Sequence, residues 1–285
     1  MDNEVDLVRI ALVAALLLQT TDDIQLSVRA RSVQPGEVVV LSISPRSPSG
    51  PLRVRAFGKE LTAYQDGDGW RAIIGIDLGT KPGTYPVHVE SGVPGGRAQA
   101  TYELRVEPKM FRTRRLTVDE AFVTPPASEL PRIEKEAATL AATFAASSPA
   151  RLWTMPFARP VPHEANSAFG TRSILNGKRR TDHGGADFLS PAGTPIGAPN
   201  AGRVALAQNL YFSGNTVIID HGLGMFSMLA HLSRIDVQPG DAVTAGQRIG
   251  LVGATGRITG PHLHWAVRIN NARVDPLSLL AILGP

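Results

Sequence analysis

The chain has 285 residues, enough for about two domains of the usual size, and its 28 glycines, 22 prolines and 6% aromatic content favour short strands joined by turns. It contains no cysteine, which excludes disulfides, thiolate zinc sites, a cysteine nucleophile and a lipid-modified N-terminal cysteine; any metal must therefore be held by His, Asp or Glu. The formal net charge of +4 suits weak association with an anionic polymer, and it suits a basic protein without a charged partner equally well.

An apolar run of nine residues, Ile10–Leu18, follows Arg9 near the N-terminus. A bilayer-spanning helix needs about 20 residues, so the length of this run is typical of the hydrophobic region of a signal peptide. We therefore expect residues 1–21 to be a signal peptide and the protein to be exported. Three of the first six residues are acidic and no Ala-x-Ala cleavage site follows. A buried helix is the alternative, and a translation start near Val8 would account for the acidic residues.

Residues 22–108 form short alternating runs of apolar and polar residues separated by turn signals such as Pro35-Gly36 and Pro82-Gly83. The runs lie at 37–42, 52–57, 70–76, 84–89 and 98–106. This spacing predicts an immunoglobulin-like β-sandwich. Its one histidine, His88, lies in a strand pattern without paired carboxylates, so we expect a structural or binding module without chemistry of its own.

A connecting region follows at residues 109–150, and we expect it to contain one linker helix. The stretch from Glu129 to Ala146 is rich in Ala, Glu, Lys and Leu, and Ser128 is a suitable N-cap. Pro131 is compatible with this helix only in the first turn. Residues 151–285 then change to glycine-punctuated strands at 203–207, 216–220, 225–229, 248–252 and 264–269. We expect this last part to be almost entirely β, and it holds six of the seven histidines.

Two spacings in the C-terminal part combine candidate metal ligands: His183-x-x-x-Asp187 and His262-x-His264. Residues an even number apart share one face of a strand, so each pair can point into one site. Catalytic zinc keeps three protein ligands and an open position, and these four side chains are enough to supply them. The spacing by itself supports a metal site and hydrogen-bonded histidines without a metal about equally. His231 ends an apolar run, where it is either a hydrogen-bonded core residue or, beside a metal, a proton-transfer group.

The segment from about residue 156 to 276 resembles the catalytic domain of the M23 metallopeptidases, the lysostaphin and LytM type of peptidoglycan endopeptidase. The resemblance covers a little under half of the chain. The motifs that carry it are Phe169-Gly170, His183-Gly-Gly-Ala-Asp187-Phe188, Asp220-His221-Gly222, Ala230-His231-Leu232, Gly246-Gln-Arg-Ile-Gly250, Gly253-Ala-Thr-Gly256, Thr259-Gly-Pro-His262-Leu-His264 and Asp275-Pro276. Such an ordered set of separated motifs is highly specific.

The resemblance implies a fold and a set of roles. The fold would be mainly β: an N-terminal immunoglobulin-like sandwich, a linker helix and a C-terminal all-β M23-type domain. His183, Asp187 and His264 would hold one zinc ion per chain, with water as the fourth ligand. His231 and His262 would act as general base and as stabiliser of the tetrahedral intermediate. Family members often carry Tyr two residues before the equivalent of His231, where this chain has Leu229.

The same resemblance implies hydrolysis of peptide cross-links in bacterial peptidoglycan by an exported protein, periplasmic or extracellular and associated with the cell wall. We expect a monomer without a nucleic-acid partner and without a membrane span in the mature chain. Two alternatives stay open. One is a catalytically inactive protein of the same fold that binds peptidoglycan and activates amidases, although such proteins typically lose zinc ligands that this chain retains. The other is a phosphohistidine carrier, against which the intact His-x-x-x-Asp pattern argues.

Overall fold

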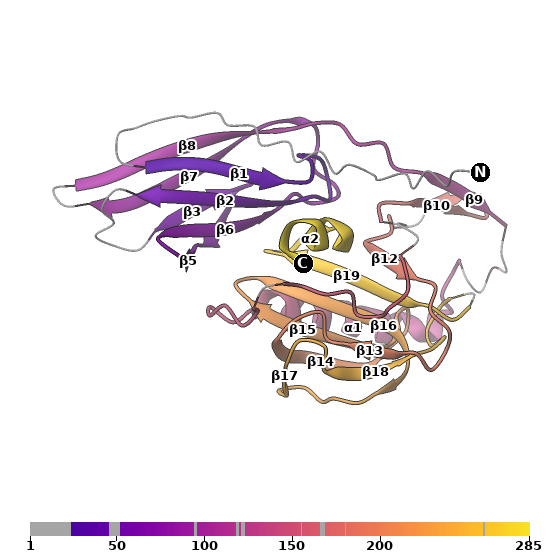
Figure 1. Ribbon diagram of the computed structural model, residues 1–285. Coiled ribbons are helices and arrows are strands. Elements are labelled where there is room, and N and C mark those ends of the chain that lie inside the picture. Colours follow the sequence, from indigo (N-terminus) through magenta and orange to yellow (C-terminus); the bar gives the residue numbers. More distant parts are fainter. Residues whose placement is uncertain are drawn as a thin grey trace, which may run out of the picture.

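The computed structural model describes residues 24–285 except 46–51, 94–95, 118–119, 121–122, 155, 166–168, 180 and 259. The predicted signal peptide at residues 1–21 lies outside the described residues. The fold is mainly β, as predicted. Along the chain, an N-terminal β-sandwich is followed by a connecting region with one helix and then by a C-terminal part rich in strands (Figure 1). Among the described residues, no helix is both long enough and apolar enough to cross a membrane.

The N-terminal part is a sandwich of two four-stranded antiparallel sheets, which confirms the predicted sandwich. One sheet has the order β1 (Ile24–Ala30), β2 (Val38–Pro45), β6 (Gly69–Gly75) and β5 (Tyr64–Asp66). The other has the order β4 (Lys59–Thr62), β3 (Arg53–Ala56), β7 (Gly83–Val93) and β8 (Gly96–Val106). Alternate residues point inward, as the pattern of period two requires. Leu41, Val54 and Leu104 are typical members of the shared core.

The C-terminal part is built on a nine-stranded sheet. Its main path is β12 (Gly185–Phe188), β19 (Leu263–Ile269), β16 (Met225–Ile235), β15 (Gly214–Gly222), β14 (Gly202–Leu210) and β17 (Ala242–Val243). Strand β18 (Arg248–Val252) pairs with β13 (Pro195–Gly197) and β16, and β20 (Ala272–Val274) pairs with β19. One short helix, α2 (Pro276–Leu283), was not anticipated. It is apolar on nearly every side, so its sequence has no polar face to reveal a helical period.

The helix of the connecting region, α1 (Leu130–Ala145), follows a 3₁₀ turn, η2 (Ala127–Glu129). Pro131 lies in the first turn, as expected. The N-cap is Glu129, whose side chain makes no capping hydrogen bond. The predicted N-cap at Ser128 is wrong, because Ser128 lies in the 3₁₀ turn that precedes the helix. The helix is more than a spacer. Its last turns pack on the C-terminal sheet, where the Phe144 ring meets the Phe226 ring edge-on at 5.4 Å between centroids. Earlier in the same region β9 (Thr113–Leu116) pairs in parallel with β10 (Arg172–Leu175), which also pairs with β11 (Lys178–Arg179).

The sandwich and the C-terminal part share an interface, and Figure 1 shows α2 and β19 directly beside β2 and β6. Val38, Val40 and Ile73 on the outer face of the sandwich belong to the same hydrophobic core as the C-terminal strands. The edge of the interface is polar. Arg31 bonds both the buried Glu37 and Asp275, the residue whose side chain caps α2.

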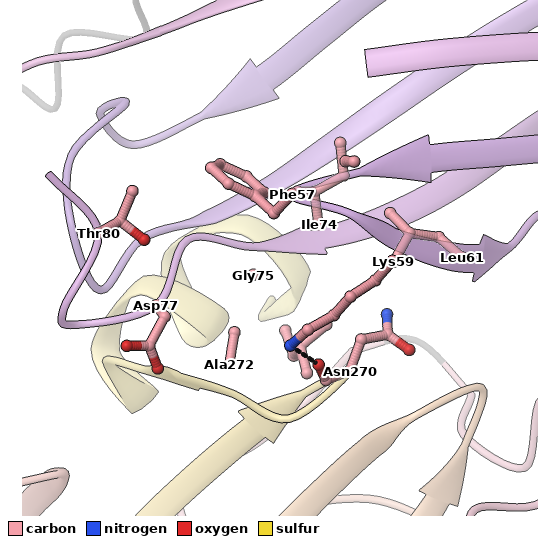
Figure 2. A pocket seen from close by; sticks show the side chains of 11 residues that line it. Phe57, Lys59, Leu61, Ile74, Gly75, Asp77, Thr80, Asn270 and Ala272 are labelled. Carbon is pink, nitrogen blue, oxygen red and sulfur yellow. Dashed lines mark hydrogen bonds between the residues drawn. The ribbon is translucent and has the colours of Figure 1, made fainter. Parts of the chain in front are cut away.

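A small cavity of about 190 Å³ remains at this junction, between the β3–β4 turn and the β19–β20 turn. Figure 2 shows Lys59 reaching across it, and its ammonium group donates to the Asn270 carbonyl oxygen at 2.6 Å. On the other side of the cavity Asp77 accepts bonds from the Arg273 side chain and backbone. Two polar contacts therefore connect the sandwich to the β19–β20 hairpin, whose first strand carries His264.

Candidate metal centre

The pairing of β12 with β19 brings two of the predicted ligands together. Asp187 and His264 are direct partners in the antiparallel register, so their side chains leave the sheet on the same face. His183 comes two residues before β12, outside the strand in which it was expected. Its imidazole still reaches the same point, and ligand atoms of the three side chains lie within 4.8 Å of one another.

The three ligand atoms form a tight triangle. His264 Nδ1 lies 2.9 Å from Asp187 Oδ1, His183 Nε2 lies 3.1 Å from the same oxygen, and the two nitrogens are 3.0 Å apart. Two ligands at the usual zinc distances of about 2.0 to 2.1 Å in tetrahedral geometry are separated by roughly 3.3 Å. The side chains are 16–21% exposed, which leaves one side of the triangle open. This donor set therefore fits a zinc ion with three protein ligands.

Charge and protonation in the triangle favour a cation. Burial would raise the pKa of Asp187, but its hydrogen bonds to His183 and His264 outweigh burial and hold that pKa far below its ordinary value. Burial is also the main reason that the pKa of His264 is lowered. An ionised carboxylate beside a neutral imidazole is the state that metal binding requires, because ligands must be deprotonated.

Neighbouring backbone fixes two of these residues. The Gly170 N–H donates to the His183 carbonyl at 2.7 Å, and the His183 N–H donates to the Thr171 carbonyl at 3.0 Å. Gly185 lies under the His264 ring, and a Cβ at this position would be 2.6 Å from His264 Cε1. The second glycine of His-Gly-Gly-Ala-Asp therefore gives the ring the space it occupies.

His231 and His262 lie beside the triangle, with ring centroids 4.9 Å apart, and the His231 ring is 6.0 Å from that of His264. His231 Nδ1 bonds the Thr255 carbonyl at 2.9 Å and His262 Nδ1 bonds the Gly260 carbonyl at 3.0 Å. A carbonyl only accepts hydrogen bonds, so each Nδ1 carries a proton, and Nε2 is the nitrogen of each ring through which a further proton can be exchanged. Burial, followed by the neighbouring His264, lowers the pKa of His231 to about 4, so this ring is neutral at pH 7.

The backbone of His231 is unusual for a strand residue, with φ at +68°. Leu229 pairs with Trp265 and is fully buried in the core, on the face opposite His264. Simple alternation would place His231 on that same core face. The left-handed conformation, at a break in the register of β16, turns the imidazole to the metal side instead. Strained conformations of this kind are concentrated at functional sites. The Leu229 side chain points away from the centre, so the side chain of a tyrosine at this position would leave the backbone on the opposite face of the sheet.

Comparisons with known proteins agree with this geometry. The model of peptidase family M23 matches residues 181–276. A solved structure of an M23-family protein from Pseudomonas aeruginosa is 36% identical to this chain, with a TM-score of 0.68, over 87% of this chain and 95% of that one. The chain belongs to peptidase family M23.

Two curated M23 relatives match the C-terminal part alone. The peptidoglycan DD-endopeptidase ShyA of Vibrio cholerae is 43% identical over 100 residues, 35% of this chain and 23% of that protein. The DD-carboxypeptidase/endopeptidase Mpg of Neisseria meningitidis is 42% identical over 97 residues, 34% of this chain and 22% of that protein. The chain thus spans less than a quarter of the length of these relatives.

All five side chains that the sequence assigned to the site meet in one place. Two further histidines of the C-terminal part lie elsewhere: His163 bonds Ser190, and the buried His221 bonds the Ala201 carbonyl and Ser227. Sequence reasoning missed the carbonyls of Thr255 and Gly260, which orient the two accessory rings. Every residue has a carbonyl, so side-chain identity gives no signal for this role.

Proposed function

We propose that this M23 protein is a zinc-dependent endopeptidase that hydrolyses peptide cross-links of bacterial peptidoglycan. The observation that carries the proposal is the convergence of His183, Asp187 and His264 within 4.8 Å, with two further imidazoles beside them. The names of ShyA and Mpg support peptidoglycan as the substrate and a DD-peptide bond as the point of cleavage.

In this proposal His183 Nε2, Asp187 Oδ1 and His264 Nδ1 hold the zinc. Zinc, when bound, supplies a Lewis acid that polarises a carbonyl group and lowers the pKa of water. His231 and His262 supply the proton transfers, because each holds its Nδ1–H on a backbone carbonyl and so exchanges protons through Nε2, beside the triangle. A proton taken up there gives an imidazolium whose Nδ1–H stays on its carbonyl. The ring can then hydrogen bond the developing oxyanion or protonate the leaving amine.

The location of the substrate determines where the protein must act. Peptidoglycan lies outside the cytoplasmic membrane, so the proposal places the protein in the periplasm or at the cell wall, in line with the predicted signal peptide. In this proposal the N-terminal sandwich is a rigid support for β19 and α2, which it contacts through the interface at Arg31 and Asp275.

The test combines zinc content with digestion of purified peptidoglycan, read by mass spectrometry of the released peptides. We expect about one zinc per wild-type chain and cleaved cross-link peptides, with both lost in His264→Ala. Zinc without cleavage would refute the proposed substrate. Neither zinc nor cleavage would leave a binding protein on a peptidase fold.

The division of roles has its own test. His183→Ala and Asp187→Ala should lose zinc and activity together. His231→Ala and His262→Ala should keep zinc and lose rate by about 10²- to 10⁴-fold, as is usual for acid–base groups. His163→Ala is the matched control, because this histidine bonds Ser190 outside the site. Equal loss of zinc in all four site variants would contradict the division.

A further inference from the structure

A second hollow adjoins the metal centre on the same face of the sheet. It has a volume of about 200 Å³, and its lining includes His264, Ala266 and Arg268 of β19, together with Met228 of β16. Residues 264, 266 and 268 alternate along one strand and therefore share a face. The floor of the hollow thus includes both His264, a candidate metal ligand, and Arg268.

The walls of the hollow come from outside the sheet. The loop 181–184 forms one side, and Phe144, near the C-terminal end of α1, forms another. The Arg268 guanidinium lies 4.3 Å from the centroid of the Phe144 ring. The helix predicted as a linker therefore seats an arginine in a hollow that begins at the candidate metal centre.

Arg268 differs from the charged groups around it, because none of the ion pairs in the described part of the chain involves it. Among the described residues, its side-chain hydrogen bond goes from Nη1 to the neutral Asn271 side chain at 2.7 Å. Its neighbour Arg273 is bound to Asp77 at 2.9 Å, and Asp182 on the opposite wall lies 3.4 Å from Arg179. Burial, followed by the charge of Arg273, lowers the pKa of Arg268, and the charge of Asp77 has a smaller opposing effect. A partly buried cation with unused donors is suited to an anion brought by a ligand.

The distance along β19 between His264 and Arg268 limits how far the anionic group of a substrate can lie from the bond at the metal centre. Four residues at about 3.3 Å each separate the Cα atoms of positions 264 and 268 by roughly 13 Å. An extended peptide covers this distance in about four residues, and in fewer if the arginine reaches toward the centre. A substrate peptide with a free carboxylate within about four residues of the bond at the metal centre would therefore place that carboxylate at Arg268.

We propose that Arg268, stacked on Phe144, is a subsite that binds a free carboxylate of the peptide substrate. This inference rests on the proposed function and adds a determinant of specificity to it. Arg268 makes no contact with the reacting atoms, so its contribution is to binding and register. A bidentate guanidinium–carboxylate pair of this kind strengthens binding by about tenfold or more.

The test uses two synthetic cross-linked peptides, one with free carboxylates and one with every carboxylate converted to the carboxamide. For the wild type we expect KM to be at least tenfold lower for the free acid, with a similar kcat for both peptides. Arg268→Gln should lose this preference and still cleave the amidated peptide as the wild type does, which shows that the fold is intact. Arg268→Lys should keep part of the preference. Arg203→Gln, an exposed arginine on β14, is the control and should behave as the wild type.

Calorimetric titration of the cleaved product peptides provides a readout that is independent of turnover. The wild type should bind the free acid about tenfold more tightly than the amide, and Arg268→Gln should bind both alike. Cleavage of both peptides by the wild type with equal KM would overturn the subsite and leave the proposed function standing. No cleavage of either peptide by the zinc-loaded wild type would overturn the proposed function, and the subsite with it.

Discussion

Gly185 packs against the His264 ring without room for a side chain, and Gly185→Ala tests how that ring is held. A Cβ at position 185 would lie 2.5 Å from the Trp265 carbonyl oxygen, 2.6 Å from His264 Cε1 and 2.7 Å from His264 Nε2. Cβ atoms essentially never come closer than 3.0 Å to such neighbours, and ordinary contact begins at 3.4 Å. The variant must therefore open this contact by about 0.5 to 0.9 Å.

Neither neighbour of Gly185 can move freely. The Trp265 carbonyl belongs to β19, which is paired with β12 at this level, and the His264 ring is held by Asp187. Overpacking of this kind costs about 1–3 kcal/mol of stability. If half of that strain, about 0.5–1.5 kcal/mol, displaces the His264 ring, zinc binding weakens by about 2- to 13-fold.

Urea unfolding and zinc competition with a chelator measure the two effects of Gly185→Ala separately. Gly184→Ala is the matched control in the same motif, because the nearest atom to its new Cβ would be Arg273 Cδ at 3.9 Å. We expect the Gly184 variant to match the wild type in both assays. A Gly185 variant that unfolds at the same urea concentration and binds zinc as tightly as the Gly184 variant would refute the steric argument.

Two further predictions concern buried charge. Burial lowers the pKa of His221 to about 4, so between pH 6.5 and 4 the unfolded chain takes up a proton that the native state refuses, and stability falls as the pH falls. His221 alone should lower the free energy of unfolding by about 2 kcal/mol between pH 7.5 and 5. In urea unfolding, the stability of His221→Asn should therefore fall by about that much less than the stability of the wild type over this pH range. Equal falls in the two proteins would contradict the prediction. Arg31→Met leaves the buried Glu37 with Lys109 as its cationic partner and should cost about 2 kcal/mol. Adding Glu37→Gln should recover part of this loss, and an Arg31 variant that unfolds like the wild type would refute the role of the pair.

Much of the fold was accessible from local patterns. The alternation of apolar residues and the Pro-Gly turns predicted the N-terminal sandwich, because strands with one buried face repeat every two residues. Glycine-punctuated runs predicted the C-terminal sheet for the same reason. The helix over residues 130–145 was expected from composition, but its N-cap was misplaced at Ser128 and its docking on the sheet was not foreseen. The apolar helix α2 was missed because burial on nearly all sides removes its periodicity.

The sequence by itself determined which side chains are available for the centre, since His183-x-x-x-Asp187 and His262-x-His264 are local spacings that need no knowledge of the fold. Only the tertiary structure decided how they meet. The register of β12 against β19 joins residues nearly 80 positions apart, and it sets both the Asp187–His264 contact and the space over Gly185. The left-handed backbone of His231 reverses the face that alternation assigns to it. Such features arise from strand pairing and strain between distant segments, which one stretch of sequence does not encode.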